Sequence, residues 1–142
     1  MKDHIINIIS IVVLILVLIL IVIFNSQFNS GVLPQIIGAC IGIIGLILWI
    51  AGKITLGEHF TTSFAPKGLV TKGIYSKMRH PMYTGGILIY LGLGLWFKSI
   101  LGLVLTMVLI VPLLVYSATL EEKLLIRAYG ERYIEYKKRT IF

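Results

Sequence analysis

The sequence predicts an all-α integral membrane protein, a helical bundle of about four transmembrane helices with a cytoplasmic loop and a C-terminal amphipathic helix. Three observations predict this class. The chain has 142 residues, which is room for one domain, 1–142. It is 58% hydrophobic and only 13% charged, whereas soluble domains carry about 25% charged residues. Its polar segments are separated by apolar runs long enough to cross a hydrocarbon core of about 30 Å.

The first two predicted spans cover approximately residues 5–24 and 32–51. The first contains no Gly and is interpreted as a retained, lipid-facing span. A signal peptide is excluded because the apolar stretch is too long and no small-x-small cleavage site follows it. The second span carries Gly38 and Gly42 on one face, with Gly45 nearby. Such a stripe of small residues predicts close packing against another helix.

The third and fourth predicted spans cover approximately residues 82–97 and 100–118 and form a tight hairpin that turns at Lys98. A re-entrant loop is the alternative. Pro112 should kink the returning helix. A cytoplasmic loop over residues 53–81 precedes the hairpin, and long loops are often functional.

The chain after the fourth span is predicted to continue as a cytoplasmic helix over residues 119–139. Gly130 should end or bend this helix. Its aromatic and basic residues, Tyr133 and Tyr136 among them, are typical of a helix at the lipid interface.

The net charge of +7 raises the question of a nucleic-acid partner. The distribution of the charge argues against a nucleic-acid partner. With four spans, all of the Lys and Arg residues except Lys98 fall on one side of the membrane. Positive residues mark cytoplasmic segments and attract anionic lipids. We therefore expect a multi-pass protein with both termini and its site on the cytoplasmic side, and with membrane lipids as partners. The single cysteine, Cys40, indicates neither a disulfide framework nor a metal cluster.

Arg79, His80 and Pro81 stand where the third span begins. Proline fits the first helical position, so the positive end of a helix dipole and its unpaired N–H groups face the loop. Together with Arg79 this makes a candidate anion site; a positive-inside anchor is the other interpretation. His80 has the chemistry of a base, a hydrogen-bond donor or a helix cap. No second His is near it in sequence, so no metal site is expected.

Two further groups of residues are candidates for the site. Gly85 and Gly92 share a helical face, which suits either close helix packing or the approach of a flat ligand. Glu121 and Glu122 point about 100° apart on one helix, so their roles should be unequal. We expect Glu121 to face a pocket and Glu122 to face solvent or Arg127. A solvated helix end is the alternative interpretation of the pair.

Four segments in this order resemble the isoprenylcysteine carboxyl methyltransferase and phospholipid methyltransferase superfamily. The likeness covers approximately residues 56–142, and its specific parts are residues 69–75, 79–85, 121–125 and 129–139. In place of the His that often precedes the first of these, this chain has Lys67-Gly68. That departure lies on the acceptor side and leaves the substrate open.

The resemblance implies S-adenosylmethionine as the cofactor and a lipophilic methyl acceptor in the membrane. It implies that Arg79 and Glu121 act in the reaction. The cofactor-binding residues that it implies are His80, Pro81, Tyr83, Gly85, Gly92, Gly94, Glu121 and Glu122, with no metal. Three acceptors stay open under the resemblance: an isoprenylcysteine carboxylate, a phospholipid amine and a small amphiphile. An NADPH-dependent relative similar to sterol reductases and a non-catalytic membrane module remain alternatives, and the oligomeric state is open.

Overall fold

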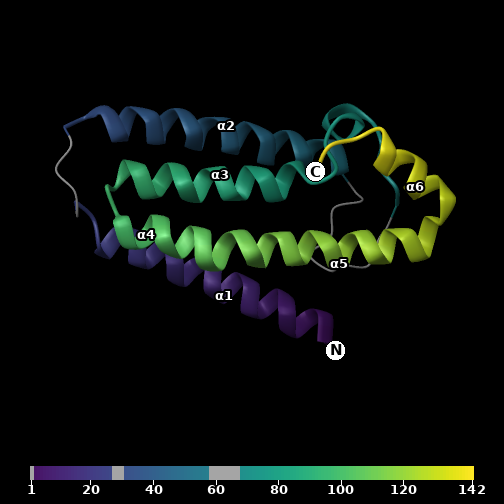
Figure 1. The fold of residues 1–142 in the computed structure, drawn as a ribbon, viewed down its shortest axis with the longest axis horizontal. Helices are drawn as coiled ribbons and strands as arrows, with labels where there is room; N and C mark the ends of the chain where they lie inside the picture. The colour runs from purple at the N-terminus through teal and green to yellow at the C-terminus, as the bar shows by residue number, and fades with distance from the viewer. Residues whose placement is uncertain (1, 27–30, 58–67) are drawn as a thin grey trace.

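In a computed structural model the chain is described for residues 2–26, 31–57 and 68–142, and for side chains from residue 8 onward. The described residues are almost entirely helical. Their elements are α1 (Lys2–Ile23), α2 (Leu33–Leu56), the 3-10 turn η2 (Gly73–Ser76), α3 (Pro81–Trp96), α4 (Ile100–Leu105), the π turn η3 (Thr106–Ile110), α5 (Val111–Tyr129) and α6 (Glu131–Lys138). In Figure 1, α2, α3 and the α4–α5 rod lie alongside one another, and α1 crosses beneath the rod.

The predicted all-α class is confirmed, and within the described residues two helices, Leu33–Leu56 and Ile100–Tyr129, are long and apolar enough to cross a membrane. The part of α1 whose side chains are described, Ile8–Ile23, is apolar but shorter. Many apolar side chains of α2 point outward, with Ile36 56% and Ile43 57% exposed. A soluble helix would bury such residues, so this exposure agrees with a membrane protein.

Helix boundaries differ from the expected ones in two places. Helix α2 continues to Leu56, so the polar segment before α3 begins later than residue 53. Residues 58–67 of the expected loop lie outside the described residues. The expected helix over residues 119–139 is divided, because α5 ends at Tyr129 and α6 begins at Glu131. Gly130 stands between them with φ +52°, as its predicted role requires.

Glycines hold α2 and α3 in backbone contact. A Cβ on Gly92 would lie 2.6 Å from the Gly38 carbonyl oxygen, and one on Gly45 would lie 2.7 Å from the Gly85 carbonyl oxygen. Both distances are shorter than any real Cβ contact, so only glycine permits this approach. The glycine stripe of α2 therefore meets the glycine face of α3, as the predicted close packing requires.

Helix α1 contributes to the core, which corrects the expectation that it only faces lipid. Its Val17 and Ile21 are fully buried and form a cluster with Ile110 of η3 and Leu114 of α5, in the rod that α1 crosses. A Cβ on Gly102 would clash with Ile21, so α4 also has a glycine where α1 crosses it. Outward residues such as Ile8, 62% exposed, occupy the other face of α1.

The α3–α4 hairpin turns at Lys98, which has φ +52°. Ser99 then caps α4, since its hydroxyl accepts a hydrogen bond from the Gly102 amide at 3.1 Å. Where a kink was predicted, the structure has the π turn η3, in which the Val111 amide bonds to the Thr106 carbonyl. Pro112 follows at the start of α5. A wider turn removes the clash between the proline ring and the carbonyl of the preceding turn.

The chain after α5 folds back onto the start of α3 (Figure 1). Ile141 pairs with the segment before α3 through a bridge to Met78. In it the Ile141 amide donates to the Lys77 carbonyl at 2.9 Å, and the Arg79 amide donates to the Ile141 carbonyl at 3.0 Å. Tyr133 of α6 is 1% exposed. It therefore packs into the protein, whereas the sequence predicted a position at the lipid interface.

The glycine contact between α2 and α3 makes a prediction about stability. Gly92→Ala should lower the free energy of unfolding by about 1–3 kcal/mol, because its Cβ would meet α2 backbone that cannot move independently. Gly42→Ala is the matched control, since its Cβ would lie 3.9 Å from the Gly92 Cα, an ordinary contact. Thermal unfolding of both variants in detergent measures the difference. Equal stability of the two variants would contradict the proposed importance of the contact.

Candidate functional site

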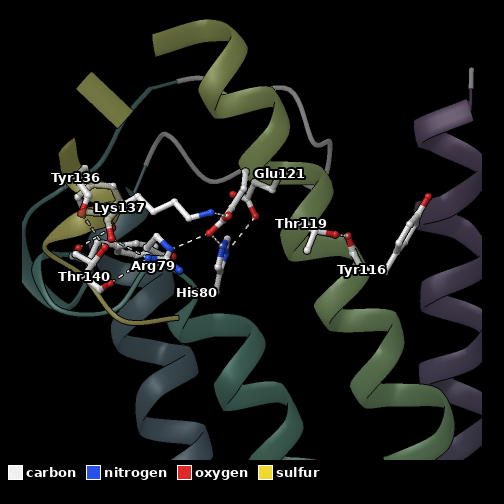
Figure 2. A network of polar contacts seen from close by, with 10 residues as sticks. Arg79, His80, Tyr116, Thr119, Glu121, Tyr136, Lys137 and Thr140 are labelled. Carbon is white, nitrogen blue, oxygen red and sulfur yellow. Dashed lines mark hydrogen bonds and ion pairs between the residues drawn. The ribbon is translucent and has the colours of Figure 1, made fainter. Parts of the chain in front are cut away.

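The polar residues predicted from sequence come together at one end of the bundle. Pro81 occupies the first turn of α3, and His80 is its N-cap residue. Opposite them lie Glu121 and Glu122 of α5 and the end of α6. In Figure 2, the side chains of Arg79, His80 and Lys137 point toward the end of α5 that carries Glu121. Residues far apart in sequence thus form one cluster.

Glu122 is the centre of this cluster. Its Oε1 accepts a hydrogen bond from Arg79 Nε at 2.8 Å and lies 3.4 Å from His80 Nε2. Its Oε2 accepts a hydrogen bond from Lys137 Nζ at 2.5 Å. These partners replace the expected solvent or Arg127. With its side chain 13% exposed, the carboxylate needs such partners to remain charged.

Arg79 joins three segments. Besides the ion pair with Glu122, its Nη1 donates to the carbonyls of Lys137 and Thr140, each at 3.0 Å. A planar guanidinium suits several acceptors at fixed angles. The arrangement lets Arg79 position the end of α6 against α5. Its predicted part in the reaction is not tested by these contacts.

His80 is buried, with 4% of its surface exposed, whereas the sequence placed it at an open helix mouth. It makes no side-chain capping bond, so the capping interpretation does not hold. The rings of Tyr83 and Phe142 lie 5.5 and 5.3 Å from its ring. Burial lowers the pKa of His80 below its usual value, although the neighbouring Glu122 opposes this shift. The imidazole is therefore neutral at pH 7.

A neutral His80 that donates from Nε2 to Glu122 leaves Nδ1 as an acceptor. This nitrogen lies 3.8 Å from Glu121 Oε2. Glu121 also accepts a hydrogen bond from the Tyr83 hydroxyl. Its side chain is 36% exposed, in contrast to that of Glu122. Two acceptors, His80 Nδ1 and the carboxylate of Glu121, thus face each other. This arrangement suits an amine or hydroxyl donor from a ligand.

Aromatic residues enclose the cluster from the side of η2 and α6. The Tyr136 hydroxyl donates to the Tyr75 carbonyl at 2.6 Å and so ties α6 to η2. Burial raises the pKa of Tyr136 to about 12, which keeps this hydroxyl protonated. The hydroxyl of the buried Tyr133 has no hydrogen-bond partner among the described residues.

The predicted glycines lie apart from the polar cluster. Gly85 and Gly92 pack on α2, as described above, and a Cβ on Gly94 would lie 2.7 Å from Leu103 of α4. Of the two interpretations left open by the sequence, the structure therefore supports helix packing for Gly85 and Gly92. Their predicted contact with a cofactor is not tested.

Sequence analysis missed the part played by α6. Lys137 binds Glu122, and Tyr136 binds the backbone at Tyr75. Tyr133, Tyr136 and Lys137 recur at the spacing that places residues on one helical face. That spacing was the available signal, but a basic and aromatic helix was assigned to the membrane surface. No group of three or more potential metal ligands occurs among the described residues.

Comparison with known proteins gives consistent results. A family model described as phospholipid methyltransferase matches residues 33–132. A protein-S-isoprenylcysteine O-methyltransferase from Xenopus laevis is 32% identical over 124 residues, covering 75% of this chain and 38% of the relative. One from Tribolium castaneum is 28% identical over 121 residues, covering 73% and 39%. Protein-S-isoprenylcysteine O-methyltransferase B from Arabidopsis thaliana is 29% identical over 108 residues, covering 72% and 55%. The chain therefore spans from about two fifths to just over half of the length of these relatives.

The cluster around Glu122 predicts a loss of stability on its neutralisation. Glu122→Gln should lower the free energy of unfolding by about 1.5–3 kcal/mol, because charged hydrogen bonds from Arg79 and Lys137 are weakened together. Glu135→Gln, the same change at an exposed position of α6, should change it by less than about 0.5 kcal/mol. Thermal unfolding compares them. A Glu122→Gln variant as stable as the control would mean that the ion pairs contribute nothing.

Proposed function

The chain belongs to the phospholipid methyltransferase family, and from this premise we propose that it is a membrane-embedded, S-adenosylmethionine-dependent methyltransferase with a lipophilic acceptor. One observation carries the proposal beyond family membership. The start of α3 meets the glutamate pair of α5 in one cluster at the end of an apolar bundle. His80 and Glu121, which face each other there, are 41 positions apart in the sequence. In the proposed arrangement this position would have water on one side and the bilayer on the other.

The proposed topology has four membrane spans, formed by α1, α2, α3 and the α4–α5 rod, with both termini and the polar cluster on the cytoplasmic side. Lys98, at the α3–α4 turn, is then the basic residue on the outer side. The positive-inside rule favours this arrangement over its inverse. Helix α3 has 16 residues and rises about 24 Å, so its basic flank Lys98 would snorkel to the outer surface.

The residues of the cluster fit the polar groups of the proposed cofactor. Glu121 has a side chain that is 36% exposed, and its Oε2 lies 3.8 Å from His80 Nδ1, which is unprotonated in the tautomer that donates from Nε2 to Glu122. Both atoms are acceptors, and a donor group between them would relieve their repulsion. We assign this position to an amino or hydroxyl group of the cofactor. Tyr83, which hydrogen-bonds to Glu121, would hold that carboxylate in place.

S-adenosylmethionine, when bound, supplies a methyl group on a sulfonium that a nucleophilic oxygen or nitrogen takes in one displacement. The tasks left to this chain are binding, orientation and exclusion of water, and orientation of two reactants contributes about 7–11 kcal/mol. Glu121, Tyr83 and His80 would bind the donor. The ion pair of Arg79 with Glu122 would fix the α3 entrance relative to α5 and α6. Gly85, Gly92 and Gly94 would serve through the close packing that fixes the direction of α3.

The acceptor is the least determined part of the proposal. An isoprenylcysteine carboxylate, a phospholipid amine and a small amphiphile all suit a site between water and lipid. The relatives named above make an isoprenylcysteine carboxylate the first acceptor to test. A carboxylate acceptor requires no general base, whereas an amine acceptor must lose a proton, for which His80 Nδ1 or Glu121 is available. A reductase-like activity with NADPH has no feature of the cluster in its favour.

The topology is tested by cysteine labelling. In a Cys40→Ala background, Lys98→Cys should react with a membrane-impermeant maleimide in intact cells, because the α3–α4 turn faces outward. Ser76→Cys should react only after permeabilisation. The reverse pattern would show that the orientation is inverted, and labelling of both in intact cells would rule out four spans.

The function is tested by ligand binding and methyl transfer. The detergent-solubilised protein should bind S-adenosylhomocysteine but not NADPH, and should transfer labelled methyl groups to a prenyl-cysteine or lipid acceptor. Glu121→Gln should raise the dissociation constant of S-adenosylhomocysteine by at least about tenfold, the effect of losing one charged hydrogen bond. Glu135→Gln should leave it unchanged. Binding of NADPH, or equal affinity in both variants, would contradict the assignment.

A further inference from the structure

Residues 139–142, which follow α6, form a short strap against His80. The ring of Phe142 in this strap lies 5.3 Å from the His80 ring, and the ring of Tyr83 lies 5.5 Å from it. His80 is left with 4% of its surface exposed. In the proposed function a polar group of the methyl donor meets His80 Nδ1. It can do so only after one of the groups that cover His80 has moved.

Of the two rings, that of Phe142 is the freer to move. Tyr83 belongs to the first turn of α3, and its hydroxyl donates a hydrogen bond to Glu121. Phe142 is 41% exposed and the neighbouring Ile141 is 66% exposed. A segment with exposed side chains and few buried apolar contacts opens more readily than a packed helix. Phe142 is therefore the group that can leave His80.

The strap is attached to the segment before α3 by a small set of hydrogen bonds. The Ile141 amide donates to the Lys77 carbonyl at 2.9 Å, and the Arg79 amide donates to the Ile141 carbonyl at 3.0 Å. Arg79 Nη1 donates to the Thr140 carbonyl at 3.0 Å (Figure 2). These three bonds all join the strap to residues 77–79, so the strap can part from that segment as a unit and return to the same place.

Helix α6 is fixed to the rest of the molecule by different contacts. Its Tyr133 is 1% exposed. The Tyr136 hydroxyl donates to the Tyr75 carbonyl at 2.6 Å, and Lys137 Nζ donates to Glu122 at 2.5 Å. None of these contacts has to break when the strap moves. The boundary between the fixed and the movable parts therefore lies at the end of α6.

We propose that the strap is the gate of the methyl-donor site. It parts from residues 77–79 to admit the donor to His80 and closes again over the bound donor. This inference rests on the proposed function. Closure gives the strap a task in the reaction, because a closed site excludes water while the methyl group is transferred. Arg79 links the gate to the site, since it bonds both to Glu122 and to the strap.

The test locks the strap in place with a disulfide. Met78 and Ile141 pair in the bridge between the strap and the segment before α3. Paired backbones lie about 4.8 Å apart, which is within the range of Cα separations that a disulfide spans. In a Cys40→Ala background, the Met78→Cys/Ile141→Cys protein should bind S-adenosylhomocysteine at least about tenfold more slowly when oxidised than when reduced, because entry depends on the open fraction. The reduced form of the same protein is the control for folding and for the substitutions themselves.

A second measurement follows the gate without any ligand. Diethyl pyrocarbonate modifies accessible imidazoles, and mass spectrometry of the full chain after digestion reports on His80 separately. The oxidised protein should protect His80 relative to the reduced protein. Phe142→Ala should increase the rate of modification, because its ring no longer covers the imidazole. Ile134→Ala is the matched control, since Ile134 is 36% exposed on α6 and lies outside the strap; it should leave the rate unchanged.

The outcomes separate the gate from the proposed function. Wild-type protein that does not bind S-adenosylhomocysteine would overturn the proposed function, and the gate for this donor with it. Wild-type binding together with equal association rates in the oxidised and reduced protein would overturn the gate alone. Equal modification of His80 in Phe142→Ala and in Ile134→Ala would also overturn the gate, because the strap would then not control access to His80.

Discussion

The carboxylate of Glu122 is the interaction on which the polar end of the molecule depends. It forms ion pairs with Arg79 from the segment before α3 and with Lys137 from α6. Three parts of the chain are therefore joined through the two oxygens of one residue. Each of these cations would be poorly placed beside an apolar bundle without a counter-charge. Because Arg79 also donates to the Lys137 and Thr140 carbonyls, the pairing fixes backbone as well as side chains.

The use of Glu122 for structure has a consequence for its neighbour. Both oxygens of Glu122 are engaged by protein groups, while Glu121 keeps an accessible side chain beside Tyr83 and His80. Two adjacent and chemically identical residues thus have different surroundings, because they point in different directions from the same helix. Arg79 and Lys137 both pair with Glu122, whereas the contacts of Glu121 are with the Tyr83 hydroxyl and His80.

The sequence was a good guide to the elements and a poor one to their partners. The apolar runs predicted α1, α2, α3 and the α4–α5 rod within a few residues, since length and hydropathy are local properties. The stripe that contains Gly38 and Gly45 indicated the close helix contact, because small residues at helical spacing have few other uses in a membrane. Gly130 marked the end of α5.

Contacts between distant segments left no comparable signal. The spacing of Tyr133, Tyr136 and Lys137 marked one face of α6, but nothing in it indicated that this face would meet Glu122. The aromatic residues of α6 matched the composition of a lipid-facing helix, although Tyr133 is buried in the protein. A helix at the membrane surface and a helix packed against a polar cluster contain the same types of residue. Here they are distinguished by the tertiary structure, in which the chain after α6 returns to the start of α3. The core role of Val17 and Ile21 could not be predicted either. Because every face of α1 is apolar, its sequence does not distinguish a face toward the protein from a face toward lipid.

The π turn before Pro112 has a geometric effect far from its own position. A π turn contains one more residue than the α-helical turn that it replaces. Without it, the same sequence in an uninterrupted α-helix would place everything after Ile110 about 100° further around the axis, which is the angle between neighbouring residues. Glu121 and Glu122 differ by that same angle. The π turn in the apolar half of the rod therefore sets the rotation of the end of α5, and with it which of two successive carboxylates faces Arg79 and which keeps the more exposed position.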